Sequence, residues 1–86
     1  MKHATLAALA TLEPILQRLR AYPQLKERRH GVFYLRSRAF LHFHEDPAGL
    51  FADIRPPTEP DFIRLEIKAA DAGADLIVLV KRALAD

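Results

Sequence analysis

Cysteine is absent from this 86-residue chain, and serine occurs once, as Ser37. The lack of cysteine excludes a disulfide framework, a zinc ribbon and thiol catalysis, and it suits a cytoplasmic protein. Because Ser37 lies in a predicted turn and Thr58 in a proline-rich loop, covalent catalysis has no evident nucleophile. A glycine-rich phosphate loop and a nucleotide fingerprint are missing too. We therefore expect no bound cofactor, and these absences argue against an enzyme.

A long apolar run is also missing. The N-terminal stretch MKHATLAALATLEP has the lysine and the short apolar run of a signal peptide, but that run spans only about nine residues. Glu13 and Pro14 close it. We therefore expect a cytoplasmic protein without a membrane segment.

Neither sign of charge is in large excess, since 13 basic residues face 11 acidic ones and the formal net charge is +2. The densest basic run is LKERRH, residues 25–30. A short charged run of this kind is usually solvated. We interpret it as a connector between a helix and a strand, and we do not expect nucleic-acid binding.

The composition, 50% hydrophobic and 28% charged, is that of a soluble globular protein, and residues 1–86 form one predicted domain. A chain of this size buries only about 60 to 65% of the surface that its unfolded form exposes. Its own core is thin, so a partner subunit would help to stabilise it.

Helical periodicity marks both ends of the chain. Leu12, Ile15, Leu16 and Leu19 recur at the spacing of one apolar helical face. Pro14 is compatible with a first helical turn, so the helix starts at Thr11, or it starts near residue 4 and kinks at the proline. The segment 71–86 carries a second apolar stripe with acids near its start, and this helix begins between residues 71 and 75.

Between the helices the period changes to two, and four runs rich in aromatic and β-branched residues read as strands: VFYLR (32–36), AFLHFH (39–44), LFADIR (50–55) and DFIRLEI (61–67). The links between them are short enough for antiparallel neighbours. We predict an α+β two-layer sandwich, in which a four-stranded antiparallel meander carries both helices on one face in the order α-β-β-β-β-α.

Strand alternation assigns the side chains to two sides of this sheet. The predicted core comprises Leu12, Leu16, Leu19, Leu41, Phe43, Ile54, Ile63, Leu65, Ile77, Val80 and Leu84. The side facing away from the helices, which we call the outer side, holds Val32, Tyr34, Arg36, Phe40, His42, His44, Phe51, Asp53, Arg55, Phe62, Arg64 and Glu66.

The turn lengths extend this assignment to a register. The four-residue turn DPAG pairs His42 with Asp53 and His44 with Phe51, and the next loop pairs Asp53 with Arg64. In the first hairpin, Tyr34 opposite Phe40 and Val32 opposite His42 preserve the two sides. We therefore predict that Asp53 lies between His42 and Arg64 and accepts hydrogen bonds from both.

The pattern F-x-H-F-H followed by a small turn and ADIR, carried by Phe40, His42, His44 and Asp53, resembles a motif of small uncharacterised bacterial domains labelled luciferase-like. The resemblance covers about the middle third of the chain. It implies a motif histidine on a strand that precedes a strand-borne aspartate, and it implies no particular activity.

Homodimerisation is the function that the sequence favours. Tyr34, Phe40, Phe51, Phe62 and Val32 are a large apolar surface for a small monomer to expose, and a second copy would cover it. In that case the histidines and the aspartate form a polar network buried across the interface.

Three alternatives use the same side of the sheet. A small molecule could bind there, with Arg55 and Arg64 among its contacts. His42, His44 and Asp53 offer ligands for Zn²⁺ or Fe²⁺, with His30 near the same end, but residues two apart on a strand must lean together to share an ion. The His42–Asp53 pair could also serve as an oriented general base.

Overall fold

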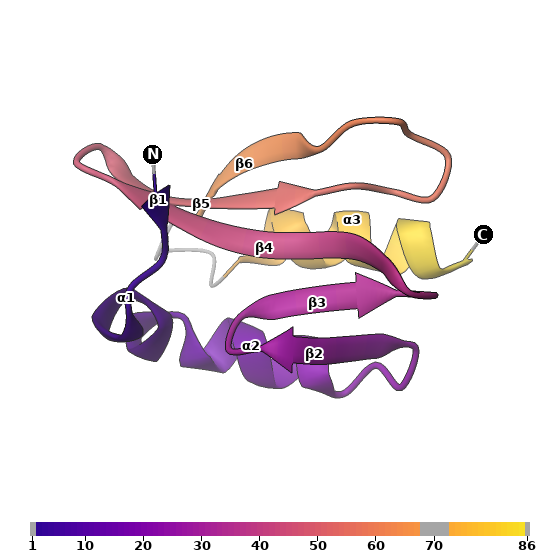
Figure 1. Ribbon diagram of the computed structural model, residues 1–86, viewed down its shortest axis with the longest axis horizontal. Coiled ribbons are helices and arrows are strands. Elements are labelled where there is room, and N and C mark those ends of the chain that lie inside the picture. The colour runs from indigo at the N-terminus through magenta and orange to yellow at the C-terminus, as the bar shows by residue number, and fades with distance from the viewer. Residues whose placement is uncertain (1, 68–72, 86) are drawn as a thin grey trace.

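The computed structural model describes residues 2–67 and 73–85, and it shows a small α+β fold with an open antiparallel sheet (Figure 1). The elements of the described residues are β1 (Lys2–His3), α1 (Leu6–Thr11), α2 (Glu13–Arg20), β2 (Leu25–Arg29), β3 (Val32–Leu35), β4 (Arg38–Asp46), β5 (Gly49–Ile54), β6 (Ile63–Ile67) and α3 (Ala74–Ala85). The strand order is β2-β3-β4-β5-β6, and β1 pairs with β4 off this path. The α+β class and the antiparallel sheet are confirmed, whereas the predicted number of four strands is wrong.

β2 occupies the segment that we interpreted as a charged connector. It pairs antiparallel with β3, and its first residue, Leu25, is buried. Glu27 accepts hydrogen bonds from the Arg20 side chain of α2 at 2.6 and 3.0 Å and from the Gly31 backbone at 2.8 Å. Gly31 has a φ of +78°, and a Cβ there would lie 2.6 Å from Leu9, so the turn into β3 requires glycine.

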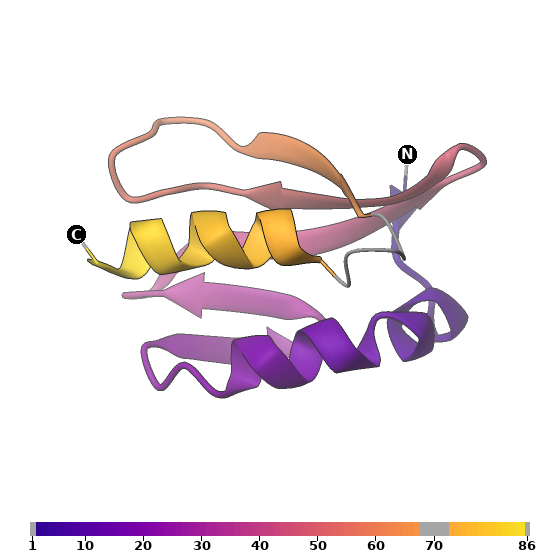
Figure 2. The ribbon, with the colours of Figure 1, turned by 180° about the vertical axis from the view of Figure 1, so that it is seen from behind.

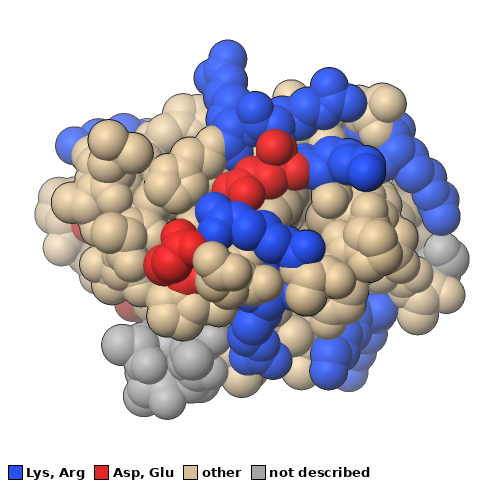
Figure 3. Space-filling model, turned by 90° about the horizontal axis from the view of Figure 1, so that it is seen from below, with Lys and Arg blue, Asp and Glu red and all other residues tan. Residues whose placement is uncertain are grey.

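The edge of the sheet formed by β2 is strongly basic. Lys26, Arg28 and Arg29 are exposed on this strand. Figure 3 views the molecule from this side and shows several Lys and Arg side chains around a smaller acidic area. Charged residues on an edge strand oppose pairing with another chain.

The N-terminal helical region consists of two helices that meet at Leu12, close to the alternative with a kink at Pro14. Thr5 caps α1, because its hydroxyl accepts a hydrogen bond from the Ala8 backbone at 3.3 Å. Thr11, our predicted cap, is the last residue of α1, and its hydroxyl donates to the Ala7 carbonyl at 3.3 Å. α3 begins at Ala74, and residue 71, the earlier of our two limits, lies outside the described residues.

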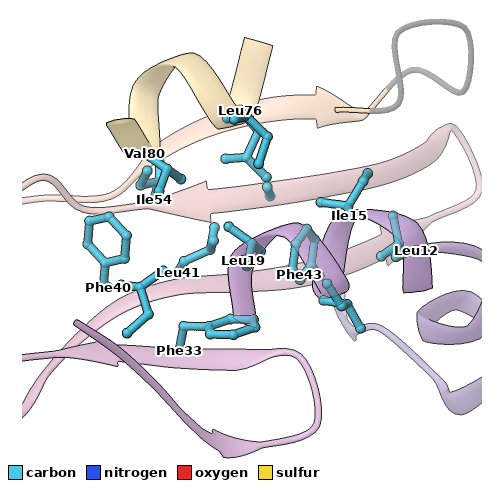
Figure 4. Packing of buried hydrophobic residues seen from close by; sticks show 14 of the residues in the cluster. Leu12, Ile15, Leu19, Phe33, Phe40, Leu41, Phe43, Ile54, Leu76 and Val80 are labelled. Atoms are coloured by element: carbon cyan, nitrogen blue, oxygen red, sulfur yellow. The ribbon is translucent and has the colours of Figure 1, made fainter. Parts of the chain in front are cut away.

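The core lies between the sheet and the helices. Figures 1 and 2 show α2 and α3 on the same side of the sheet, and Figure 4 shows their apolar side chains meeting those of the strands. Of the predicted core, these residues are buried: Leu12, Leu16, Leu19, Leu41, Phe43, Ile54, Ile77 and Val80. Leu65 and Leu84 pack against this cluster and are partly buried.

Ile63 is the predicted core residue for which the assignment is wrong. Its side chain is 41% exposed although it pairs with the buried Ile54. β6 is the last strand of the sheet, so Ile63 has a neighbouring strand on one side only. Figure 2 shows β6 beyond α3 rather than beneath it, which leaves the edge strand thinly covered.

A β-bulge reverses the predicted position of Phe40. Phe33 pairs with Leu41 but Tyr34 pairs with Ala39, so Phe40 is an extra residue in β4. Phe40 and Leu41 both face the core, where they are 1% and 0% exposed. A bulge lets two consecutive side chains share one side of a sheet. The predicted Tyr34–Phe40 pair is therefore wrong.

The remaining predicted pairs are confirmed. His42 pairs with Asp53, and Asp53 pairs with Arg64 on the other side. Val32 pairs with His42. The DPAG turn sets the first of these registers, since Glu45 and Leu50 face each other across it as the turn length requires.

Among the helices of the described residues, none is long and apolar enough to span a membrane.

Candidate functional site

Three adjacent strands bring His42, Asp53 and Arg64 into one row on the outer side of the sheet. Asp53 is buried, with 6% of its surface exposed, and it is the central residue of the row. Arg64 donates to both of its carboxylate oxygens, from Nε at 2.7 Å and from Nη2 at 2.8 Å. These hydrogen bonds lower the pKa of Asp53, and burial opposes them. The carboxylate is therefore ionised and its charge is balanced by the guanidinium.

The imidazole next to Asp53 belongs to His44 and not, as predicted, to His42. The Nε2 atom of His44 lies 3.1 Å from Oδ2 of Asp53, but the two are not aligned for a hydrogen bond. His44 is the diagonal neighbour of Asp53 across β4 and β5. Diagonal pairs on one side of a sheet are within reach of ring side chains, which explains how register alone misassigned the partner.

His3 completes a group of three imidazoles. β1 places it opposite His44 on β4. The ring centroids lie 5.1 Å apart for His3 and His44, 5.6 Å for His3 and His42, and 4.6 Å for His42 and His44. One nitrogen of each ring lies within 4.8 Å of the others. We call these three residues the histidine cluster.

His3 was not predicted as a site residue, because a two-residue strand has no periodicity to detect. The chain contains four histidines, and nothing in the sequence was a reason to place His3 beside His42 and His44. His30, which we placed near the same end, is exposed in the β2–β3 turn and is not part of the group found among the described residues.

Three contacts hold His3 against β4. Besides the β1–β4 pairing, the Ala4 backbone donates to the Phe43 carbonyl at 3.1 Å. The Thr5 backbone donates to Oε1 of Glu45 at 2.6 Å, and Thr5 then caps α1. The Glu45 carboxylate therefore fixes the chain directly after His3.

Two members of the histidine cluster are largely withdrawn from solvent. Burial lowers the pKa of His42, the neighbouring His44 lowers it further, and Asp53 acts in the opposite direction. Its imidazole is therefore neutral at physiological pH and keeps a free lone pair. Nδ1 of His42 and both ring nitrogens of His44 are buried without a hydrogen-bond partner among the described residues.

Aromatic and arginine side chains surround the cluster. Phe62 packs edge-on against His42 with ring centroids 4.9 Å apart, and the Arg55 guanidinium lies 4.6 Å above the Phe62 ring. Phe51 faces His44 across the strand pair. Tyr34 lies farther along the sheet, where Arg28 covers its ring at 5.4 Å.

Two residues predicted for the outer side are elsewhere. Phe40 belongs to the core. Arg36, which we placed at the end of a strand, lies in the β3–β4 turn with a φ of +54°. The strand pairing places His42, Asp53 and Arg64 side by side, as predicted.

Comparison of the chain with family models, curated proteins and solved structures finds no match. The resemblance to luciferase-like domains stays a prediction.

Proposed function

We propose that this protein binds a divalent transition-metal ion such as Zn²⁺ through His3, His42 and His44. The carrying observation is that one nitrogen of each ring lies within 4.8 Å of the others. Imidazole is a preferred ligand of Zn²⁺, Cu²⁺ and Ni²⁺. Buried imidazole nitrogens without hydrogen-bond partners are costly, and metal coordination would satisfy one nitrogen on each ring.

Small movements would complete the coordination. Zinc–nitrogen bonds of about 2.0 to 2.1 Å at tetrahedral angles place the nitrogens about 3.4 Å apart. The largest separation in the histidine cluster is at most 4.8 Å, so the rings have to approach by no more than about 1.4 Å. His3 is exposed on a two-residue strand and is the member with most room to move.

One ion pair dominates the charges beside the histidine cluster. Arg64 would repel a metal ion, but its charge is neutralised by two hydrogen bonds to Asp53. The same carboxylate lies 3.1 Å from Nε2 of His44. Carboxylates commonly fix the orientation of metal-binding histidines through a hydrogen bond, so this contact would have to become aligned when a metal binds.

The proposal is one of binding, without catalysis. Three nitrogen ligands leave a fourth position for water or another ligand. The general-base alternative loses its geometry, because the carboxylate of Asp53 lies against Arg64 and His44 instead of His42.

Isothermal titration of chelator-treated protein with ZnCl₂ tests this proposal. We expect one zinc ion per chain. Replacement of His3, His42 or His44 by alanine should each weaken binding by more than roughly 100-fold, beyond the 10- to 100-fold loss typical of residues that only orient ligands.

His30→Ala is the matched control, because His30 is also exposed near the same end of the sheet but outside the histidine cluster. Its affinity for zinc should equal that of the unmodified protein. Absence of binding at a one-to-one ratio, or an equal loss in His30→Ala, would contradict the proposal.

Homodimerisation through the outer side is a second proposal, now on a narrower surface. The half-buried side chains of Val32, Tyr34, Phe51 and Phe62 support it. Phe40 no longer contributes, and arginines already cover Tyr34 and Phe62. Such a dimer requires a two-layer arrangement in which the outer side is free of helices. A cytoplasmic location, which the lack of cysteine suits, is part of the same proposal.

A further inference from the structure

A hollow lies beside the β3–β4 turn. Its volume is about 210 Å³. Leu35, Ala39, Phe40 and Pro57 form an apolar floor, and three arginines surround it. Ala39 precedes His42 by three residues, or about 10 Å of extended strand. The hollow is therefore separate from the histidine cluster.

The backbone around this hollow departs twice from regular hairpin geometry. Arg36 and Ser37 form a two-residue turn in which both have positive φ, +54° and +69°, where glycine and asparagine are the favoured residues. The bulge at Phe40 follows directly, and its carbonyl accepts a hydrogen bond from the Arg55 backbone at 2.7 Å. Strained turns and bulges both concentrate at functional sites.

The three arginines have no acidic partner among the described residues. Arg55 donates Nε and Nη2 to the Ala39 carbonyl at 3.1 and 2.8 Å, and Arg38 donates to the Glu59 carbonyl at 3.1 Å. By contrast, Arg20 and Arg64 each bind a carboxylate. Arg36, Arg38 and Arg55 therefore line the hollow without a carboxylate partner among the described residues.

We propose that this hollow binds a small organic anion, in which an apolar body carries a phosphate or carboxylate group. Guanidinium groups recognise the oxygens of both anions by paired hydrogen bonds. The apolar floor, which includes the buried Phe40, would hold the body of the ligand. We call this hollow the arginine pocket.

Titration followed by amide NMR tests the arginine pocket, with phenyl phosphate, benzoate and inorganic phosphate as probes. We expect saturable shifts at the amides of Ala39 and Phe40 with phenyl phosphate or benzoate, and the tighter of the two identifies the anionic group. Inorganic phosphate should bind at least roughly tenfold more weakly, because it cannot use the apolar floor.

Two variants and a control connect the binding to the arginines. Arg36→Gln and Arg38→Gln should each weaken phenyl phosphate binding roughly three- to tenfold, since each removes a charged hydrogen-bond donor. Arg18→Gln, at an exposed arginine on α2, should leave it unchanged. His3→Ala should also leave phenyl phosphate binding unchanged, which would distinguish this site from the metal site.

Three results would overturn the arginine pocket. The first is the absence of saturable shifts with both aromatic anions. The second is equal affinity for inorganic phosphate, which would remove the apolar body from the ligand. The third is an equal loss in Arg18→Gln, which would reduce the effect to general attraction by a basic surface.

Discussion

Phe40→Ala measures the consequence of the β-bulge in β4. The side chain is 1% exposed and packs among the buried residues of Figure 4. Loss of a buried phenylalanine typically costs about 3 to 5 kcal/mol. A domain of this size has a free energy of unfolding of about 4 to 13 kcal/mol, so the variant should be strongly destabilised.

Phe51→Ala is the matched control, because Phe51 is a half-buried phenylalanine on the outer side. We expect it to cost about 1 kcal/mol, as is common for partly exposed positions. Urea unfolding followed by circular dichroism at neutral pH gives both values. If Phe40→Ala does not fold, Phe40→Leu replaces it, with an expected loss of about 1 to 2 kcal/mol.

The assignment from sequence, which placed Phe40 on the outer side without a bulge, predicts that Phe40→Ala costs less stability than Phe51→Ala. A loss below about 1 kcal/mol for Phe40→Ala, smaller than the loss for Phe51→Ala, would refute the bulge. It would also remove the floor of the arginine pocket.

Further predictions concern β2, the segment after His3 and the outer side. Glu27→Gln should cost about 1 kcal/mol in urea unfolding at neutral pH. Hydrogen bonding to Arg20 lowers the pKa of Glu27 in the folded state, so its contribution is present above pH 4.5 and disappears as the pH falls through the lower folded value. The difference between the two proteins should therefore shrink at acidic pH, and a constant difference would contradict the ion pair. Glu45→Ala should weaken zinc binding about tenfold in titration with little change in stability, because it removes the acceptor of the Thr5 backbone and loosens the segment after His3; unchanged affinity would show that the β1–β4 pairing suffices. Phe51→Glu or Phe62→Glu should convert a dimer to monomers in sedimentation analysis, and a dimer that survives both changes would place the interface elsewhere.

The sequence predicted the middle of the sheet well because two signals agreed there. The DPAG turn fixed the pairing of β4 with β5, and alternation from Leu41 to Phe43 assigned the sides. Register and side are linked by the two-residue period of a strand. Asp53 opposite His42 follows from these two signals, and its pairing with Arg64 follows from the length of the next loop.

The missed features lack a periodic signal. β1 has two residues, and β2 has the single buried apolar side chain of Leu25. Glu27 replaces a hydrophobic residue on the helix side of β2, where Arg20 from α2 satisfies it. A charged pair of this kind depends on tertiary contacts, so local sequence cannot distinguish β2 from a solvated connector.

The bulge at Phe40 also depends on tertiary contacts that the local sequence does not show. Two adjacent large apolar residues, Phe40 and Leu41, both gain by burial. One extra residue in β4 lets both of them enter the core. Strict alternation cannot represent this choice, because the energy of burying Phe40 is gained only when α2 and α3 supply the opposing surface.

The free-energy cost of burying unpaired nitrogens in the histidine cluster distinguishes the two proposed functions. Buried polar atoms without partners typically destabilise a fold by about 1 to 3 kcal/mol each, and three such nitrogens belong to His42 and His44. A dimer interface over the outer side would have to bring hydrogen-bonding groups of the partner chain to these nitrogens. A metal ion satisfies one nitrogen of each ring at once, and it also uses His3, which an interface would not require. At a free metal concentration 1,000 times the dissociation constant, binding stabilises the folded state by about 4 kcal/mol, more than the cost of one unpaired nitrogen. The participation of His3 is therefore the feature that favours the proposed cation site over the proposed interface.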